Sequence, residues 1–292
     1  MIRPIQAPFG KGTPVGGMSE GQGGSRFRRG GCHQSVTEGL NHCTRQSRET
    51  NSELYALQSS DPFYTRVLSL FESYGTGVAF VGFWAQIIED QPTALISRFE
   101  DKFSLYLTGS SDLEEIAAFL HFQGAGAVMA ESRFFPKMKY NYALSGQVLR
   151  YRDDHYISDL EIYEPEIKEV YDLLLTCESE IFRVPPYLSF LSDVTHRRNL
   201  GKCTVIGTKL DGALASSVMT VSETEHAAIL GAVATHPDCR KRGLSRELVR
   251  TLASRITGQG RAAYVFSASD QNTRFYQNSG FEITAGFREI FL

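Results

Sequence analysis

The sequence predicts an α+β protein in which two folded units follow a polar N-terminal segment. The chain has 292 residues, and a single domain usually contains roughly 100–200. Short apolar runs of strand length alternate with segments of helical periodicity over residues 51–292. Asp211-Gly212 lies between two strand-like runs and predicts a hairpin, whereas the apolar run 227–235 leads through a short turn into a helix.

Residues 1–50 are expected to form a disordered tail. The segment is rich in Gly, Ser, Arg and Gln, so it cannot bury enough apolar surface to offset its ordering entropy. It carries seven Lys and Arg residues against three acidic ones. An RNA-contacting arm around Arg26, Arg28 and Arg29 is one interpretation. We favour a solvated tail or a translation start placed too early, for which Met18 is an internal candidate.

Residues 51–135 are predicted to form the first, smaller unit. The expected elements are a helix over 54–74, strands over 78–88, 93–99 and 103–107, a helix over 113–120 and a strand over 127–130. Asp112 is placed to cap the second helix, with Glu114 and Glu115 in its first turn. Residues 136–153 are polar and aromatic without strong periodicity, and we interpret them as a linker.

Residues 154–292 are predicted to form the second unit. The expected elements are strands over 156–162, 203–210, 214–222, 227–235, 262–267 and 281–291, and helices over 164–177, 187–198, 244–256 and 273–278. In the helix that follows strand 227–235, Leu244, Leu248, Leu252 and Ile256 repeat every four residues. This pattern indicates an amphipathic helix packed on a sheet.

Composition excludes several classes of function. The hydrophobic content of 42% and charged content of 22% are those of a soluble globular protein. No apolar run approaches the roughly 20 residues of a membrane span, and the start lacks a secretory h-region, so we expect a cytoplasmic protein without membrane insertion. The net charge is −3, and the folded part is mildly acidic, which argues against nucleic acid as a partner. Five scattered cysteines lack the spacing of a metal site or disulfide framework.

The turn before the helix 244–256 has features of an anion site. Arg240, Lys241 and Arg242 precede Gly243, which permits close backbone approach, and the first amide N–H groups of a helix lack intrahelical partners. Basic residues oppose the dipole at a helix N-terminus, and a bound pyrophosphate would explain their presence. On physical grounds alone, an ordinary strand-to-helix turn with solvated basic side chains remains an equal alternative.

This strand, turn and helix resemble the acetyl-CoA-binding motif of the GNAT superfamily of N-acetyltransferases. The family pattern Gln/Arg-x-x-Gly-x-Gly/Ala is matched by Arg240 and Gly243, whereas Ser245 is a small residue that departs from it. Farther along, Asn272, Phe275-Tyr276 and Ser279-Gly280-Phe281 also follow the family order. The whole arrangement is similar to proteins with tandem GNAT-like halves, of which the first would be degenerate, since it lacks a basic Gly-rich loop.

The resemblance implies a mixed sheet in which strands 227–235 and 262–267 run parallel and splay apart around the pantetheine arm of acetyl-CoA. It implies that the following residues bind acetyl-CoA: Val233, Ala234, Thr235, Arg240, Lys241, Arg242, Gly243, Leu244, Ser245 and Asn272. Tyr276 corresponds to the acid that protonates the departing thiolate. No metal is expected.

The general base is not identified by the sequence. Many relatives carry a Glu on the strand before the turn, but 227–235 contains no carboxylate. Glu223, Glu225 and His226 are neighbours only in sequence, and His236 is attractive because an unperturbed histidine pKa lies near 6.5. Transfer of the proton through water or to solvent is the alternative.

The resemblance therefore implies an N-acetyltransferase that acts on a primary amine of a small molecule or a protein. The first unit is expected to cover the acceptor site or to form a homodimer surface. The missing strand carboxylate leaves open a catalytically silent module that binds acetyl-CoA or a protein partner.

Overall fold

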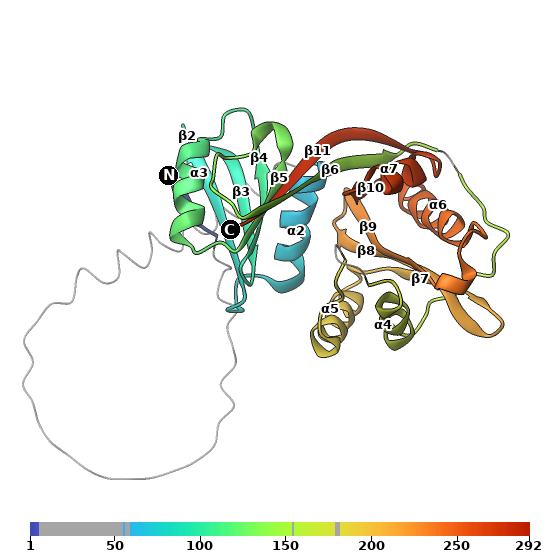
Figure 1. Ribbon diagram of the computed structural model, residues 1–292. Coiled ribbons are helices and arrows are strands. Elements are labelled where there is room, and N and C mark those ends of the chain that lie inside the picture. Colours follow the sequence, from blue (N-terminus) through green and yellow to red (C-terminus); the bar gives the residue numbers. More distant parts are fainter. Residues whose placement is uncertain (6–54, 56–58, 154, 179–181) are drawn as a thin grey trace, which may run out of the picture.

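The computed structural model describes residues 1–5, 55, 59–153, 155–178 and 182–292, which form one sheet with helices on both faces (Figure 1). The strands are β1 (Ile2–Pro4), β2 (Val81–Ile88), β3 (Gln91–Phe99), β4 (Lys102–Leu107), β5 (Ala127–Glu131), β6 (Tyr142–Tyr151), β7 (Val205–Leu210), β8 (Ala213–Glu223), β9 (Ala227–Thr235), β10 (Ala262–Ser267) and β11 (Phe281–Phe291). The helices are α2 (Pro62–Tyr74), α3 (Leu113–Phe122), α4 (Ile167–Leu175), α5 (Tyr187–Asn199), α6 (Leu244–Thr257) and α7 (Asp270–Gln277), with single 3-10 turns η1 (Ser132–Phe134) and η2 (Pro237–Cys239).

The sheet is mixed, as predicted. Its order is β1-β2-β3-β4-β5-β11-β6-β10-β9-β8-β7. The pairs β4–β5 and β9–β10 are parallel, one in each half of the chain. The remaining neighbours pair antiparallel. Each half thus contains a parallel strand pair connected by a helix, α3 in the first half and α6 in the second.

The two halves exchange strands at their junction. Strand β6 belongs to the first half in sequence order but lies between β10 and β11. Strand β11 ends the second half but lies between β5 and β6. The β6–β11 register runs from Phe281 opposite Tyr151 to Phe291 opposite Tyr142, so both strands pass from one half to the other (Figure 1). The two predicted units therefore share one continuous sheet.

The predicted linker 136–153 and the strand 156–162 are both wrong. Residues 142–151 form β6, whose pairing partners lie more than 100 residues away in sequence and leave no local signal. Past β6, the backbone N–H of Tyr156 donates to Ser254 Oγ on α6 at 2.8 Å, and its hydroxyl donates to Glu247. The chain thus follows the outer surface of α6 there instead of joining the sheet.

The expectation that residues 1–50 are disordered is wrong for the first residues. Ile2–Pro4 form β1, which pairs antiparallel with β2 and occupies the edge of the sheet. Ile5 is buried in the core beside α2, and its N–H donates to Phe83 O at 2.7 Å. The burial of Ile5 and the hydrogen bonds between β1 and β2 hold residues 1–5 against the sheet. Residues 6–50, with the arginines of the suggested RNA arm and Met18, lie outside the described residues.

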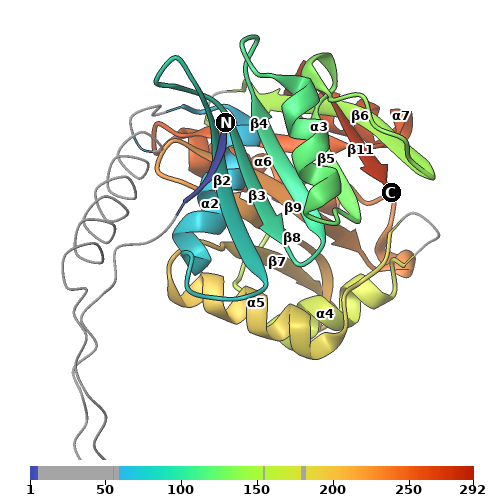
Figure 2. The same ribbon diagram turned by 90° about the vertical axis from the view of Figure 1, so that its left-hand side faces the viewer.

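The helices divide between the two faces of the sheet. Helices α3, α6 and α7 contribute buried side chains to the clusters on one face, and α2, α4 and α5 to those on the other. Helix α6 buries Leu248, Leu252 and Ile256, as its periodicity predicts. Figure 2 shows α4 and α5 side by side beneath β7 and β8.

Candidate functional site

The carboxyl ends of β9 and β10 separate, as the resemblance implies. The two strands pair in parallel from Ala262 opposite Ala227 to Val265 opposite Leu230. Beyond this point β9 continues to Thr235 without pairing to β10. Helix α6 follows β9 and α7 follows β10, so both helices begin at the open edge (Figure 1). The carboxyl ends of parallel strands are where ligands commonly bind in such sheets.

A β-bulge shapes the end of β9. The β8–β9 register jumps between Ser217 opposite Ala234 and Met219 opposite Gly231, so β9 contains one extra residue. Ala232 adopts a positive φ of 48° within it. A bulge breaks the ladder and re-aims the groups beside it.

The three residues after the bulge point to different faces. Val233 packs against the core under α6, and Ala234 is buried against α4. The Thr235 hydroxyl lies 2.8 Å from Ser216 Oγ. Facing β10, this stretch has no strand partner among the described residues, so its backbone groups can bind an extended ligand.

The turn 240–245 presents backbone amides and cations at the start of α6. Gly243 is the N-cap, with φ 81° and no side-chain cap, and Lys241 also has a positive φ of 62°. Arg240, Lys241 and Arg242 are exposed, whereas Leu244 and Ser245 are half-buried. A Cβ atom at Gly243 would meet nothing within 4 Å, so glycine is required by the backbone conformation. The geometry is that of an uncapped helix N-terminus that can receive an anion.

Arg240 also contacts two groups that the sequence did not place here. Its Nε atom lies 3.4 Å from Thr235 O, and a terminal nitrogen lies 3.8 Å from Cys177 Sγ. The Cys177 thiol is itself 3.6 Å from Thr235 O. Cys177 follows α4, 58 residues before Thr235 in the chain, so no sequence pattern could have placed it. The end of α4 therefore borders the open end of β9.

Tyr276 and Asn272 lie on α7, four residues apart and thus on one side of the helix. The N–H of Asn272 donates to the capping Ser269 Oγ at 3.2 Å, and its side chain is exposed. Tyr276 is only 9% exposed and packs edge-on against Phe275 and Phe281. Burial raises the pKa of Tyr276 to about 12. The hydroxyl therefore keeps its proton at neutral pH, as a general acid requires.

Three of the four residues considered as a base lie at the wrong end of β9. Glu223 pairs opposite Ala228 near the start of the strand, and Glu225 and His226 precede the strand. The carboxylate of Glu223 forms an ion pair with Arg261 at 2.9 Å. His236 alone follows the open end of β9, where its Nδ1 atom accepts from the Asp238 N–H at 3.4 Å.

The corresponding turn of the first half is closed to anions. There the strand β4 leads through Thr108-Gly109-Ser110 to α3, whose N-cap is Asp112. The Asp112 carboxylate accepts from the N–H groups of Glu114 and Glu115 at 3.1 and 3.0 Å. A carboxylate therefore already occupies the amides that would hold a phosphate. Both glutamates add negative charge to the same turn.

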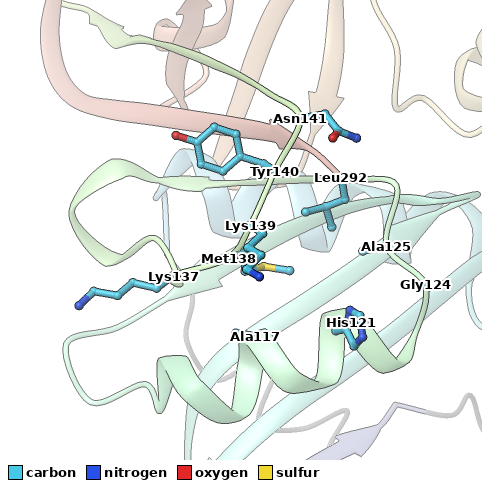
Figure 3. A pocket seen from close by; sticks show the side chains of 10 residues that line it. All are labelled: Ala117, His121, Gly124, Ala125, Lys137, Met138, Lys139, Tyr140, Asn141 and Leu292. Atoms are coloured by element: carbon cyan, nitrogen blue, oxygen red, sulfur yellow. The ribbon is translucent and has the colours of Figure 1, made fainter.

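A groove of about 610 Å³ lies elsewhere, at the opposite end of α3. Figure 3 shows His121 on α3 facing the Leu292 side chain across it, with Met138 and Lys139 on the loop that precedes β6. None of the sequence-predicted site residues lines this groove. We therefore place the candidate site at the β9–β10 opening, where the predicted residues come together.

The described residues contain no group of three or more His, Cys, Asp and Glu side chains arranged to hold a metal ion. No helix among them is both long and apolar enough to cross a lipid bilayer.

Comparisons with known proteins identify a family and a fold. Residues 167–281 match the model of the Acetyltransferase (GNAT) family. No curated protein sequence matches the chain. The fold is similar to an acetyltransferase from the GNAT family of Colwellia psychrerythraea, with 11% identity and a TM-score of 0.52 over 82% of this chain and 97% of that one.

Two further solved structures are similar. A GCN5-related N-acetyltransferase from Sphaerobacter thermophilus has 13% identity and a TM-score of 0.51, over 77% of this chain and 84% of that one. A tandem GNAT protein from the clavulanic acid biosynthesis pathway has 12% identity and a TM-score of 0.51, over 80% of this chain and 89% of that one. At identities this low, the similarity shows a common fold alone.

Proposed function

Because the C-terminal half of the chain is a GNAT-family acetyltransferase domain and the chain has the GNAT fold, we propose that this acyltransferase is an N-acetyltransferase. It transfers the acetyl group of acetyl-CoA to a primary amine of a small molecule or a protein. The observation that carries the proposal is the β9–β10 opening, flanked on one side by the uncapped α6 turn and on the other by a buried tyrosine.

The donor groups at the opening fit acetyl-CoA. The amides of residues 241–245 and the exposed side chains of Arg240, Lys241 and Arg242 would hold the pyrophosphate. The side of Val233–Thr235 that faces β10, which has no strand partner there, would hydrogen-bond the pantetheine arm, with Asn272 on the opposite side of the gap. Acetyl-CoA supplies a thioester carbonyl that an amine can attack.

The reaction then needs an acid and a route for one proton. The amine nitrogen forms a bond to the acetyl carbon, and the carbon–sulfur bond breaks. The Tyr276 hydroxyl, which is protonated at neutral pH, donates its proton to the departing sulfur, and the phenolate so formed then recovers a proton from solvent. The amine proton leaves through His236, the titratable candidate at the open end, or through water to solvent.

A catalytically silent acetyl-CoA-binding module is the second candidate function. The absence of a carboxylate from β9 favours it. Such a module would bind acetyl-CoA with the same turn and the same opening, and it would release no thiol with any amine.

Acetyl-CoA binding and free-thiol release against a panel of primary amines test both functions. The unchanged protein is expected to bind acetyl-CoA in calorimetry and to release thiol with at least one amine. Binding without thiol release would favour the silent module, and no binding would defeat both. Ser245→Glu places a carboxylate in the first turn of α6. There its charge stabilises the helix through the helix dipole but repels pyrophosphate. It should abolish binding, whereas the control Gln259→Glu, which adds the same charge just beyond the other end of α6, should not.

A further inference from the structure

Ser217 lies on β8 directly opposite Ala234, beside the bulge of β9. Its side chain points to the same face of the sheet as Met219, two residues farther along the strand. Met219 and Ala234 belong to the cluster that packs under α4. Ser217 is therefore on the face opposite α6, next to the end of β9 where Cys177 contacts Thr235 O.

The Ser217 hydroxyl is buried without a hydrogen-bond partner. The residue is 1% exposed, and its Oγ atom contacts no donor or acceptor among the described residues. The neighbouring Ser216, in contrast, has hydrogen-bond partners: its Oγ atom donates to Ala234 O at 2.8 Å and also contacts the Thr235 hydroxyl. A buried polar group left unpaired destabilises the fold, and an alanine would avoid this penalty.

The position of the hydroxyl suggests what it binds. The α6 turn and the tyrosine of α7 lie on one face of the sheet, so a second substrate reaches the thioester from the other face. On that face, next to the bulge, Ser217 offers a hydroxyl oxygen whose lone pairs can accept a hydrogen bond. A neutral primary amine has two N–H groups and one lone pair. If one N–H donates to the hydroxyl, the lone pair is free to attack and the other N–H supplies the proton that is lost.

Resting on the proposed function, we propose that Ser217 Oγ accepts a hydrogen bond from the acceptor amine and selects primary over secondary amines. A secondary amine has a single N–H group, and the reaction removes its proton. No second N–H group then remains to donate a hydrogen bond to the Ser217 hydroxyl. Ser217 is 1% exposed, so the proposal requires a local opening that admits the amine to its hydroxyl. Ser217 orients the nitrogen and takes no proton from it.

The test compares Ser217→Ala with Ser216→Ala. In urea unfolding, Ser217→Ala should keep or raise the midpoint, whereas Ser216→Ala, which removes a hydroxyl hydrogen-bonded within the sheet, should lower it. With the panel amine that the unchanged protein acetylates best, Ser217→Ala should lower kcat/KM about tenfold, which corresponds to about 1.4 kcal/mol. The affinity for acetyl-CoA should not change.

A second readout addresses selectivity. The selectivity is the ratio of kcat/KM for that amine to kcat/KM for its N-methyl derivative. This ratio should fall about tenfold in Ser217→Ala. It should stay constant in Ser217→Thr, which keeps the hydroxyl. An unchanged ratio, or an unchanged kcat/KM for the primary amine, would overturn the proposal.

The stability measurement separates this inference from the proposed function. If the unchanged protein releases no thiol with any amine, the proposed function fails, and the urea midpoints still show whether the Ser217 hydroxyl lacks a partner within the protein. A midpoint lowered by Ser217→Ala as much as by Ser216→Ala would show that the hydroxyl has a partner within the protein, and would refute the inference. A midpoint that is kept supports the unpaired hydroxyl.

Discussion

Replacing Glu223 by alanine should lower the free energy of unfolding without changing kcat. The Glu223 carboxylate accepts from the N–H and hydroxyl of Thr204 at 3.1 and 3.0 Å, and from the Thr220 hydroxyl. Its other oxygen pairs with Arg261 at 2.9 Å, and the two side chains are 6% and 17% exposed. The pair closes the end of the sheet at which β9 begins.

The magnitude follows from what the substitution leaves behind. Removing one partner of a buried ion pair leaves an uncompensated charge, which typically costs about 3–5 kcal/mol. The Arg261 side chain keeps some access to water, so we expect a loss near the lower limit, about 3 kcal/mol. The double variant Glu223→Leu with Arg261→Met removes both charges and should recover most of that loss.

Urea unfolding measures the free energy, and thiol release measures the chemistry. Glu223→Ala should keep the kcat of the unchanged protein at a temperature where it is folded, because the carboxylate lies at the end of β9 opposite the predicted thioester. A fall in kcat of a hundredfold with less than about 1 kcal/mol of lost stability would refute this reasoning and restore Glu223 as a base.

Three further outcomes follow from the structure. Tyr276→Phe should lower thiol release about 100-fold with unchanged acetyl-CoA affinity. An equal rate in the Phe variant would exclude Tyr276 as the acid. Because the Tyr276 pKa is about 12, the pH–rate profile should show no alkaline limb from this group up to about pH 10. The contribution of Tyr276 to the free energy of unfolding should fall only between about pH 10 and about pH 12, where the unfolded chain loses this proton and the folded protein keeps it. Asp112→Ala removes the cap of α3 and should lose about 1 kcal/mol in urea unfolding, and a changed acetyl-CoA affinity would contradict the assignment of binding to the second half. Trp84 is the single tryptophan and lies in the first half, so its fluorescence and far-UV circular dichroism should report one coincident unfolding transition, whereas separate transitions would argue against a shared sheet.

Features that depend on neighbouring residues could be predicted from the sequence. The leucine repeat of α6 and the glycine before it are local signals, and the structure places Gly243 at the N-cap with Leu248 and Leu252 buried. The hairpin at Asp211-Gly212 joins β7 and β8 for the same reason, since both residues adopt positive φ.

Features that depend on distant pairing could not be predicted. Strand β6 shows no clear alternation in sequence, and both its neighbours, β10 and β11, come from the far end of the chain. The edge strand β1 is only three residues long and is held by a partner about 80 residues away. In the site, the contact of Cys177 with Thr235 and the unpaired hydroxyl of Ser217 arise from packing between elements. Neither residue type nor spacing carries that information.

The exchanged strands give the degenerate half a structural role at the site. Strand β6 forms the outer neighbour of β10, and it pairs with β10 up to Ser267 opposite Gln147, at the end where β10 leaves β9. A Cβ atom at Gly146 would lie 2.1 Å from Ser267 O, so the two strands approach there as closely as a glycine allows. This pairing satisfies the outer edge of β10 while its inner edge faces the opening. The first half therefore contributes to the candidate site without a turn of its own that is open to anions, because it supplies the strand that pairs with β10.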